Sequence, residues 1–136
     1  MNLLVIGSGG NDTIDFSGHS SNAWAEIAYY DATGPVQFSV NGTANTGSVA
    51  KPGGFTDTIL DVRNPLQAGG LTLTGSASGD TFTVDGGADS WMRVIGGAGN
   101  DTFNLTLSDT VRLSFAWGPG ARIGGATVNI GTGVIS

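Results

Sequence analysis

An internal repeat constrains the fold of this 136-residue chain more than any other feature. Residues 3–16 (LLVIGSGGNDTIDF), 71–84 (LTLTGSASGDTFTV) and 92–105 (MRVIGGAGNDTFNL) share one layout: an apolar strand, a turn of small residues, Asp-Thr and a second strand. Two strands and two turns in about 20 residues form a unit that buries its apolar side chains only by stacking on its neighbours. The repeat therefore predicts an all-β fold, a parallel β-roll or β-solenoid, over one domain of residues 1–136.

The strand pattern also predicts which side chains face the core. Phe82 and Val84 alternate at the two-residue period of a strand, as do Phe103 and Leu105, so these pairs are expected to form an inner column. Apolar positions at helical spacing are interrupted by glycine throughout, which predicts no long helix. Further strand-like runs cover residues 25–31, 36–41, 56–62, 111–117 and 126–130.

Residues 17–56 depart from the repeat and are rich in Ser, Asn, Thr and Gly, most of all in 41–54 (NGTANTGSVAKPGG). We expect a degenerate, larger coil with a protruding loop here, although a mobile loop is equally compatible with this composition. An antiparallel sandwich remains the alternative fold, because its hairpins also use Gly-Asp and Asn-Asp turns.

Composition narrows the possible partners. Eleven acidic residues face five basic ones, for a net charge of −6, and every acid except Glu26 is Asp, a turn residue and a ligand of hard cations. The basic residues form no stripe that could neutralise a phosphate backbone, so nucleic acid is not an expected partner. The chain has no Cys, which leaves metals that prefer oxygen ligands.

The apolar opening of the chain breaks at Gly7, too early for a membrane span. We therefore expect that any export signal lies elsewhere or that the chain is an excised fragment.

One turn carries a specific motif. Residues 96–104 (GGAGNDTFN) match the nonapeptide GGxGxDxUx at every specified position, U being a large apolar residue. Its glycines permit positive φ, its Asp supplies negative charge, and its Phe anchors the turn in the core. In this motif the chain resembles the repeats-in-toxin family, also called hemolysin-type calcium-binding repeats. The resemblance implies calcium between the turns of successive coils, with ligands from the Asp101 carboxylate and the carbonyls of Gly96, Ala98 and Gly99.

Two other turns keep most of the motif. Residues 75–82 (GSASGDTF) retain Gly75 and Asp80, with Ser at two glycine positions, and residues 7–14 (GSGGNDTI) depart only at Ser8. By the same resemblance Gly75, Asp80, Gly7, Gly9 and Asp12 are candidate calcium-site residues. Residues 53–57 and 86–91 keep only fragments and are expected to form turns that bind nothing. The alternative for all of them is an Asp that only caps its turn through its side chain.

A second similarity extends the first. Residues 12–22 (DTIDFSGHSSN) look like a segment of the calcium-binding C-terminal domain of serralysin-type metalloproteases. The resemblance implies an extracellular, calcium-binding structural module, exported by bacterial type I secretion and belonging to a surface layer, adhesin or self-assembling fibre. Exposed strand edges favour a homo-oligomer or stacking on neighbouring modules of a longer chain. The alternative is an accessory module of a secreted polysaccharide-active enzyme or protease.

The sequence predicts no enzyme. The single histidine, His19, has only sequence neighbours as partners, and no H-E-x-x-H zinc motif is present. Aromatic residues offer another route to function, because indole and phenol rings stack on sugars and on other proteins. Trp91 and Tyr30 are the candidates for such contacts, with a polysaccharide as a possible partner.

Overall fold

The computed structural model describes residues 3–7, 9–19, 23–87, 90–106, 110–114 and 126–130, with the backbone alone described for 110–114, 126 and 130. These residues are mostly β-strand, with one short helix. The strands are β1 (Leu3–Ile6), β2 (Thr13–Asp15), β3 (Ala25–Ala28), β4 (Gln37–Asn41), β5 (Thr46–Lys51), β6 (Phe55–Leu60), β7 (Leu71–Thr74), β8 (Thr81–Asp85), β9 (Trp91–Ile95), β10 (Asp101–Thr106), β11 (Thr110–Ser114) and β12 (Ala126–Ile130), and the helix is α1 (Arg63–Gln67).

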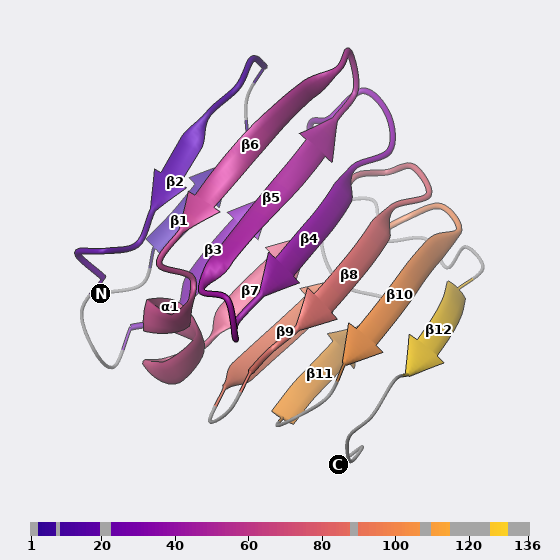
Figure 1. Cartoon of the computed structure of the whole chain (residues 1–136). Helices are drawn as coiled ribbons and strands as arrows, with labels where there is room; N and C mark the ends of the chain where they lie inside the picture. The colour runs from indigo at the N-terminus through magenta and orange to yellow at the C-terminus, as the bar shows by residue number, and fades with distance from the viewer. Residues whose placement is uncertain are drawn as a thin grey trace.

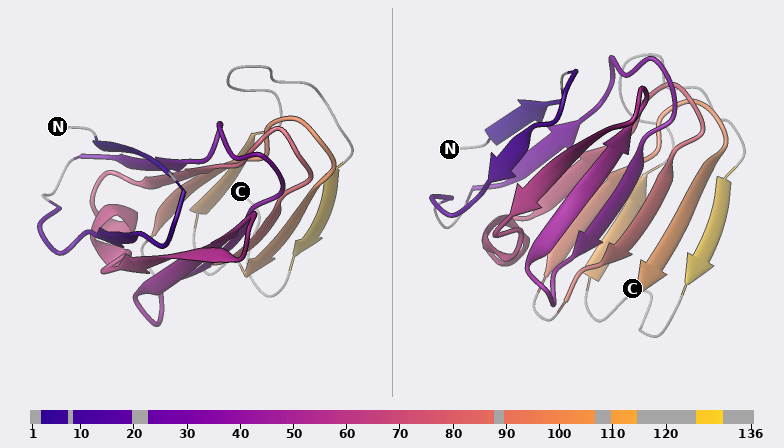
Figure 2. Two further views of the ribbon diagram at one scale, coloured as in Figure 1. Left: turned by 90° about the horizontal axis from the view of Figure 1, so that it is seen from above. Right: turned by 45° about the horizontal axis from the view of Figure 1, so that its top comes forward.

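The strands form two sheets that face each other as layers (Figures 1 and 2). The five-stranded sheet has the order β1-β3-β7-β9-β11, and the seven-stranded sheet has the order β12-β10-β8-β4-β5-β6-β2. From β7 to β12 successive strands alternate between the sheets, and each strand from β9 to β12 pairs in parallel with the strand two places earlier. This alternation places the turn after β7 beside the turn after β9.

The predicted parallel β-roll or β-solenoid is wrong for this chain, because the seven-stranded sheet is mixed. Strand β5 runs antiparallel to both β4 and β6, whereas a β-roll pairs its strands in parallel throughout. The two hairpins separate β4 from β6, so β2 pairs with β6 and lies at the far end of the sheet. The antiparallel sandwich does not describe the chain either, since the other strand pairs are parallel.

The prediction of a protruding loop within residues 41–54 is also wrong, because this segment contains strand β5. A turn at its start is held by Asn41, whose Oδ1 accepts a 2.9 Å hydrogen bond from the Ala44 N–H, and by Asn45 at φ 65°. Gly53 and Gly54 adopt φ 87° and 82° in the next turn, a conformation that glycine reaches without steric cost. Such turn residues favour tight hairpins, so the polar composition reflects two turns around a strand.

The core lies between the layers and contains the predicted inner column. Phe82, Val84, Phe103 and Leu105 are all buried in one apolar cluster, which confirms this expectation. The Phe82 ring stacks on Phe38 at a centroid distance of 4.8 Å and on Phe103 at 5.1 Å. These distances match the spacing of adjacent strands, about 4.8 Å, so in-register parallel pairing stacks the rings automatically.

Helix α1 lies at one side of the layers and buries Pro65 and Leu66. The helix is fastened to the segment that follows β2 through Asn64, whose side-chain amide donates a 2.8 Å hydrogen bond to the Phe16 carbonyl. Within the described part of the chain, no helix has the length and apolarity needed to span a membrane.

Candidate functional site

The turn of residues 75–80 lies directly against the turn of residues 96–101. A Cβ atom added at Gly97 would lie 2.7 Å from the Ser76 carbonyl oxygen, and one added at Gly99 would lie 2.6 Å from the Ser78 carbonyl oxygen. Both glycines also have φ near +90°, so each is required by its conformation and by the close approach. The repeat therefore brings two turns into contact, with the Ser76 and Ser78 carbonyls against Gly97 and Gly99, and we call these two segments the paired turns.

Asp80 and Asp101 each accept a hydrogen bond from a backbone N–H next to the neighbouring strand of the seven-stranded sheet. Asp101 Oδ1 accepts a 2.9 Å hydrogen bond from the Asp80 N–H, and Asp80 Oδ1 accepts one of 2.8 Å from the Val36 N–H. Asp80 also accepts hydrogen bonds from the Ser76 N–H and hydroxyl, so it caps its own turn. Each carboxylate thus orders the chain segment that precedes the neighbouring strand.

Both carboxylates are buried where little solvent can stabilise their charge. Asp80 is 1% exposed and Asp101 is 5% exposed. Desolvation raises the pKa of Asp80 despite its hydrogen bonds, and it raises the pKa of Asp101 to about 6, with repulsion from Asp80 adding to the effect. Among the described residues, no basic side chain forms an ion pair with either acid. The paired turns therefore concentrate negative charge without an ion-paired cation from the described part of the chain.

This burial predicts that stability in chelator falls as the pH rises from about 4 to 6. The Asp101 pKa is higher in the folded chain than its ordinary value of 3.8, so the folded state binds a proton that the unfolded state releases across this window. Ionisation should lower the free energy of unfolding by about 1–2 kcal/mol, less than for a fully dry carboxylate because solvent screens part of the charge. Urea unfolding at several pH values measures the slope.

Asp101→Asn is the matched control for this pH dependence, because its amide oxygen still accepts the Asp80 N–H without a charge. We expect a flatter profile between pH 4 and 6. A wild-type profile that rises over this interval, or the same slope in both proteins, would show that Asp101 does not titrate as described.

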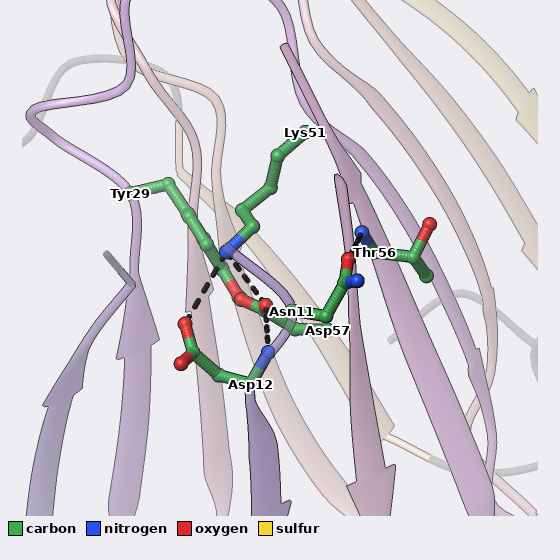
Figure 3. Close-up of polar contacts among 6 residues, drawn as sticks. All are labelled: Asn11, Asp12, Tyr29, Lys51, Thr56 and Asp57. Carbon is green, nitrogen blue, oxygen red and sulfur yellow. Dashed lines mark hydrogen bonds and ion pairs between the residues drawn. The ribbon is translucent and has the colours of Figure 1, made fainter. Parts of the chain in front are cut away.

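A second carboxylate pair of the same design lies in the N-terminal half, and Figure 3 shows it. Asp57 Oδ1 accepts a 2.9 Å hydrogen bond from the Asp12 N–H, which repeats the arrangement of Asp101 and Asp80. Here a cation is present, because Lys51 Nζ lies 2.6 Å from Asp57 Oδ1 and 3.3 Å from Asp12 Oδ2. Tyr29 completes the group by donating a 2.5 Å hydrogen bond to Asp57 Oδ2.

This second group is buried, and its residues come from β5, β6 and the segments next to β2 and β3. The side chain of Lys51 is 5% exposed and that of Asp57 is fully buried. Burial and the adjacent Asp57 carboxylate raise the pKa of Tyr29, so the phenol stays protonated and donates. Asn11 adds a further tie between strands, since its Oδ1 accepts a hydrogen bond from the Thr56 N–H (Figure 3). We call Lys51, Asp57, Asp12 and Tyr29 the lysine cluster.

The structure separates the predicted site residues into three places. Asp80, Asp101, Gly75, Gly96, Ala98 and Gly99 belong to the paired turns. Asp12 belongs to the lysine cluster instead, and Gly7 and Gly9 line a cavity of about 480 Å³ beside it. Trp91 and Tyr30 are on the five-stranded sheet side, where Trp91 is 50% exposed and the Tyr30 hydroxyl donates to Glu26.

Sequence reasoning missed Lys51 and Asp57. The sequence predicts that residues 53–57 form a turn that binds nothing. It gives no reason to single out Lys51 from the other basic residues, which form no stripe. The Asp-Thr pair at 57–58 repeats those at 12–13, 80–81 and 101–102, and this repetition is the signal that could have identified Asp57. No comparable pattern marks Lys51, because a hairpin absent from the repeat brings it to the cluster.

The donor set limits which ion the paired turns could hold. Within the described ranges, no group of three or more His, Cys, Asp or Glu residues is placed to bind a metal. A cation here would take most of its ligands from backbone carbonyls and few from carboxylates, and such an all-oxygen set suits a hard cation such as Ca²⁺. Asp101 fits this role better than Asp80, since no described group donates a hydrogen bond to its Oδ2.

Comparisons with family models, with curated proteins and with solved structures found no match to this chain.

Proposed function

We propose that this chain is a calcium-binding structural module of an exported protein, with the ion at the paired turns. The observation that carries the proposal is the burial of the Asp80 and Asp101 carboxylates beside stacked turn carbonyls, with no ion-pairing basic side chain among the described residues. An uncompensated buried charge destabilises a fold, and a bound divalent cation would remove that cost. Asp101 and the carbonyls of Gly96, Ala98 and Gly99 are the proposed ligands.

The lysine cluster supports this assignment by comparison. The chain uses the same carboxylate-to-N–H bond in both halves, and in one half the Lys51 ammonium supplies the positive charge. The complete nonapeptide motif lies in the other half, where no described basic side chain pairs with Asp80 or Asp101. We therefore assign calcium to Asp80 and Asp101, and we assign Asp12 to the internal ion pair.

A calcium titration tests the proposal. Wild-type protein in EGTA should gain stability when CaCl₂ is added, by about 2.7 kcal/mol at a free concentration 100 times the dissociation constant. Asp101→Asn should lose this gain. Asp15→Asn should retain it, because Asp15 is an exposed residue of β2 that only accepts a hydrogen bond from the Ser17 N–H. Circular dichroism during urea unfolding measures each stability.

Two results of that titration would refute the metal assignment: no response of the wild type to calcium, or a full response in Asp101→Asn. MgCl₂ at the same concentration separates calcium binding from general screening of the net charge of −6, since Mg²⁺ requires a smaller octahedral site. An equal gain with magnesium would identify screening as the cause.

The exposed edge strand β1 supports a structural role with neighbours. β1 lies at the edge of the five-stranded sheet, and Leu3, Leu4 and Ile6 are 41%, 50% and 52% exposed. An apolar strand with a free edge is a template for pairing with another chain or module. Static light scattering of the calcium-loaded sample tests this part: an assembly supports it, and a monomer at all concentrations contradicts it.

A further inference from the structure

The outer face of the five-stranded sheet carries a groove of about 430 Å³ between two tryptophans. Trp24 immediately precedes β3 and Trp91 begins β9, with β7 between these strands. Trp24 is 40% exposed and Trp91 is 50% exposed. Since adjacent strands are about 4.8 Å apart, the backbones of the two tryptophans are about 10 Å apart across the sheet.

Gly70 makes room for the Trp91 indole in this groove. Gly70 lies in front of β7, and a Cβ added there would lie 2.3 Å from Trp91 Cδ1. Gly70 also has φ 107°, a conformation that other residues rarely adopt. The Trp91 indole therefore packs on the backbone of Gly70 and forms one wall of the groove.

A row of hydrogen-bonding groups runs beside the aromatic row. Glu26, Thr72 and Arg93 are direct cross-strand neighbours on β3, β7 and β9, and all three line the groove. Glu26 is held in place by hydrogen bonds of 2.8 Å from the Tyr30 hydroxyl and 2.7 Å from the Thr74 hydroxyl. The groove thus has two indoles along one line and a carboxylate, a hydroxyl and a guanidinium along the next.

We propose that this groove binds an extended, neutral, β-linked hexose polymer running across the strands. The C–H faces of a sugar ring pack on indoles, and the hydroxyls at its rim exchange hydrogen bonds with carboxylate, hydroxyl and guanidinium groups. One acid and one base balance the charge in the groove, and the net charge of −6 repels a polyanion. The two tryptophans lie in one row across the sheet, which suits an extended chain.

Affinity electrophoresis in native gels containing hydroxyethyl cellulose tests the proposal, with cellohexaose titration by calorimetry as the second measurement. Both use the full chain in CaCl₂. Wild-type protein should be retarded, and Trp91→Ala and Trp24→Ala should each weaken cellohexaose binding at least tenfold. Phe55→Ala is the matched control, because Phe55 is a 42% exposed aromatic on the seven-stranded sheet, and its binding should be unchanged.

The outcomes separate clearly. Failure of wild-type protein to bind either glucan, or equal binding by the wild type and both tryptophan variants, would overturn the proposal. Retardation in alginate gels alone would contradict the neutral polymer. Circular dichroism checks the fold of each variant, and either tryptophan variant suffices if the other fails to fold. The result does not depend on Asp101, so it stands or falls separately from the calcium assignment.

Discussion

Lys51→Met should lower the free energy of unfolding by about 3–5 kcal/mol, because it leaves the Asp57 carboxylate buried without its cation. Methionine preserves most of the side-chain volume, so the loss reports charge and hydrogen bonding more than packing. Asp57 is fully buried and its Oδ1 lies 2.6 Å from Lys51 Nζ. Of its partners among the described residues, the Tyr29 hydroxyl and the Asp12 N–H would remain to stabilise it. Urea unfolding followed by circular dichroism measures the change.

The double variant Lys51→Met with Asp57→Asn is the control for this effect. Removing both charges leaves no uncompensated carboxylate at position 57, so the double variant should recover part of the lost stability. A loss below about 1 kcal/mol in Lys51→Met would contradict the buried ion pair, since exposed pairs have effects of that size.

Phe82→Ala is expected to have an effect of similar size, about 3–5 kcal/mol, through the core. The Phe82 ring is fully buried and stacks on both Phe38 and Phe103, so its removal opens a cavity in the middle of the column. The neighbouring rings are fixed by the register of β4, β8 and β10 and cannot close the gap without shifting the strands. Thermal and urea unfolding measure the loss.

Two comparisons sharpen the Phe82 prediction. Phe82→Leu should cost less than Phe82→Ala, because leucine fills part of the cavity. Phe55→Ala should change stability by less than about 0.5 kcal/mol, since Phe55 is 42% exposed and lies outside the core cluster. A loss in Phe82→Ala as small as that in Phe55→Ala would show that the column is not the core of the fold.

The sequence predicted the parts of the structure that follow from local repetition. The strands at 71–74, 81–85, 91–95 and 101–106 and their buried phenylalanines follow from alternation and from the 21-residue offset between repeats. The contact between the paired turns follows from the same offset, because parallel pairing in register brings equivalent turns together. Asp80 and Asp101 could therefore be placed side by side without a structure.

The mixed sheet could not be predicted in this way. Residues 41–54 contain turn formers that serve a mobile loop, a coil corner or a hairpin equally well, and only tertiary pairing with β4 and β6 selects the hairpin. The lysine cluster depends on that choice, since β5 carries Lys51 to Asp57. The tryptophan groove is also tertiary, because Trp24 and Trp91 are far apart in sequence and become neighbours only across β7.

The antiparallel hairpin sets a limit on redesign of this molecule. Shortening residues 41–54 to make the strand pairing uniformly parallel would delete the ammonium that balances two carboxylates. The hairpin and the Lys51 ammonium therefore cannot be removed separately. A variant that lacks residues 41–54 also needs substitutions at Asp12 and Asp57.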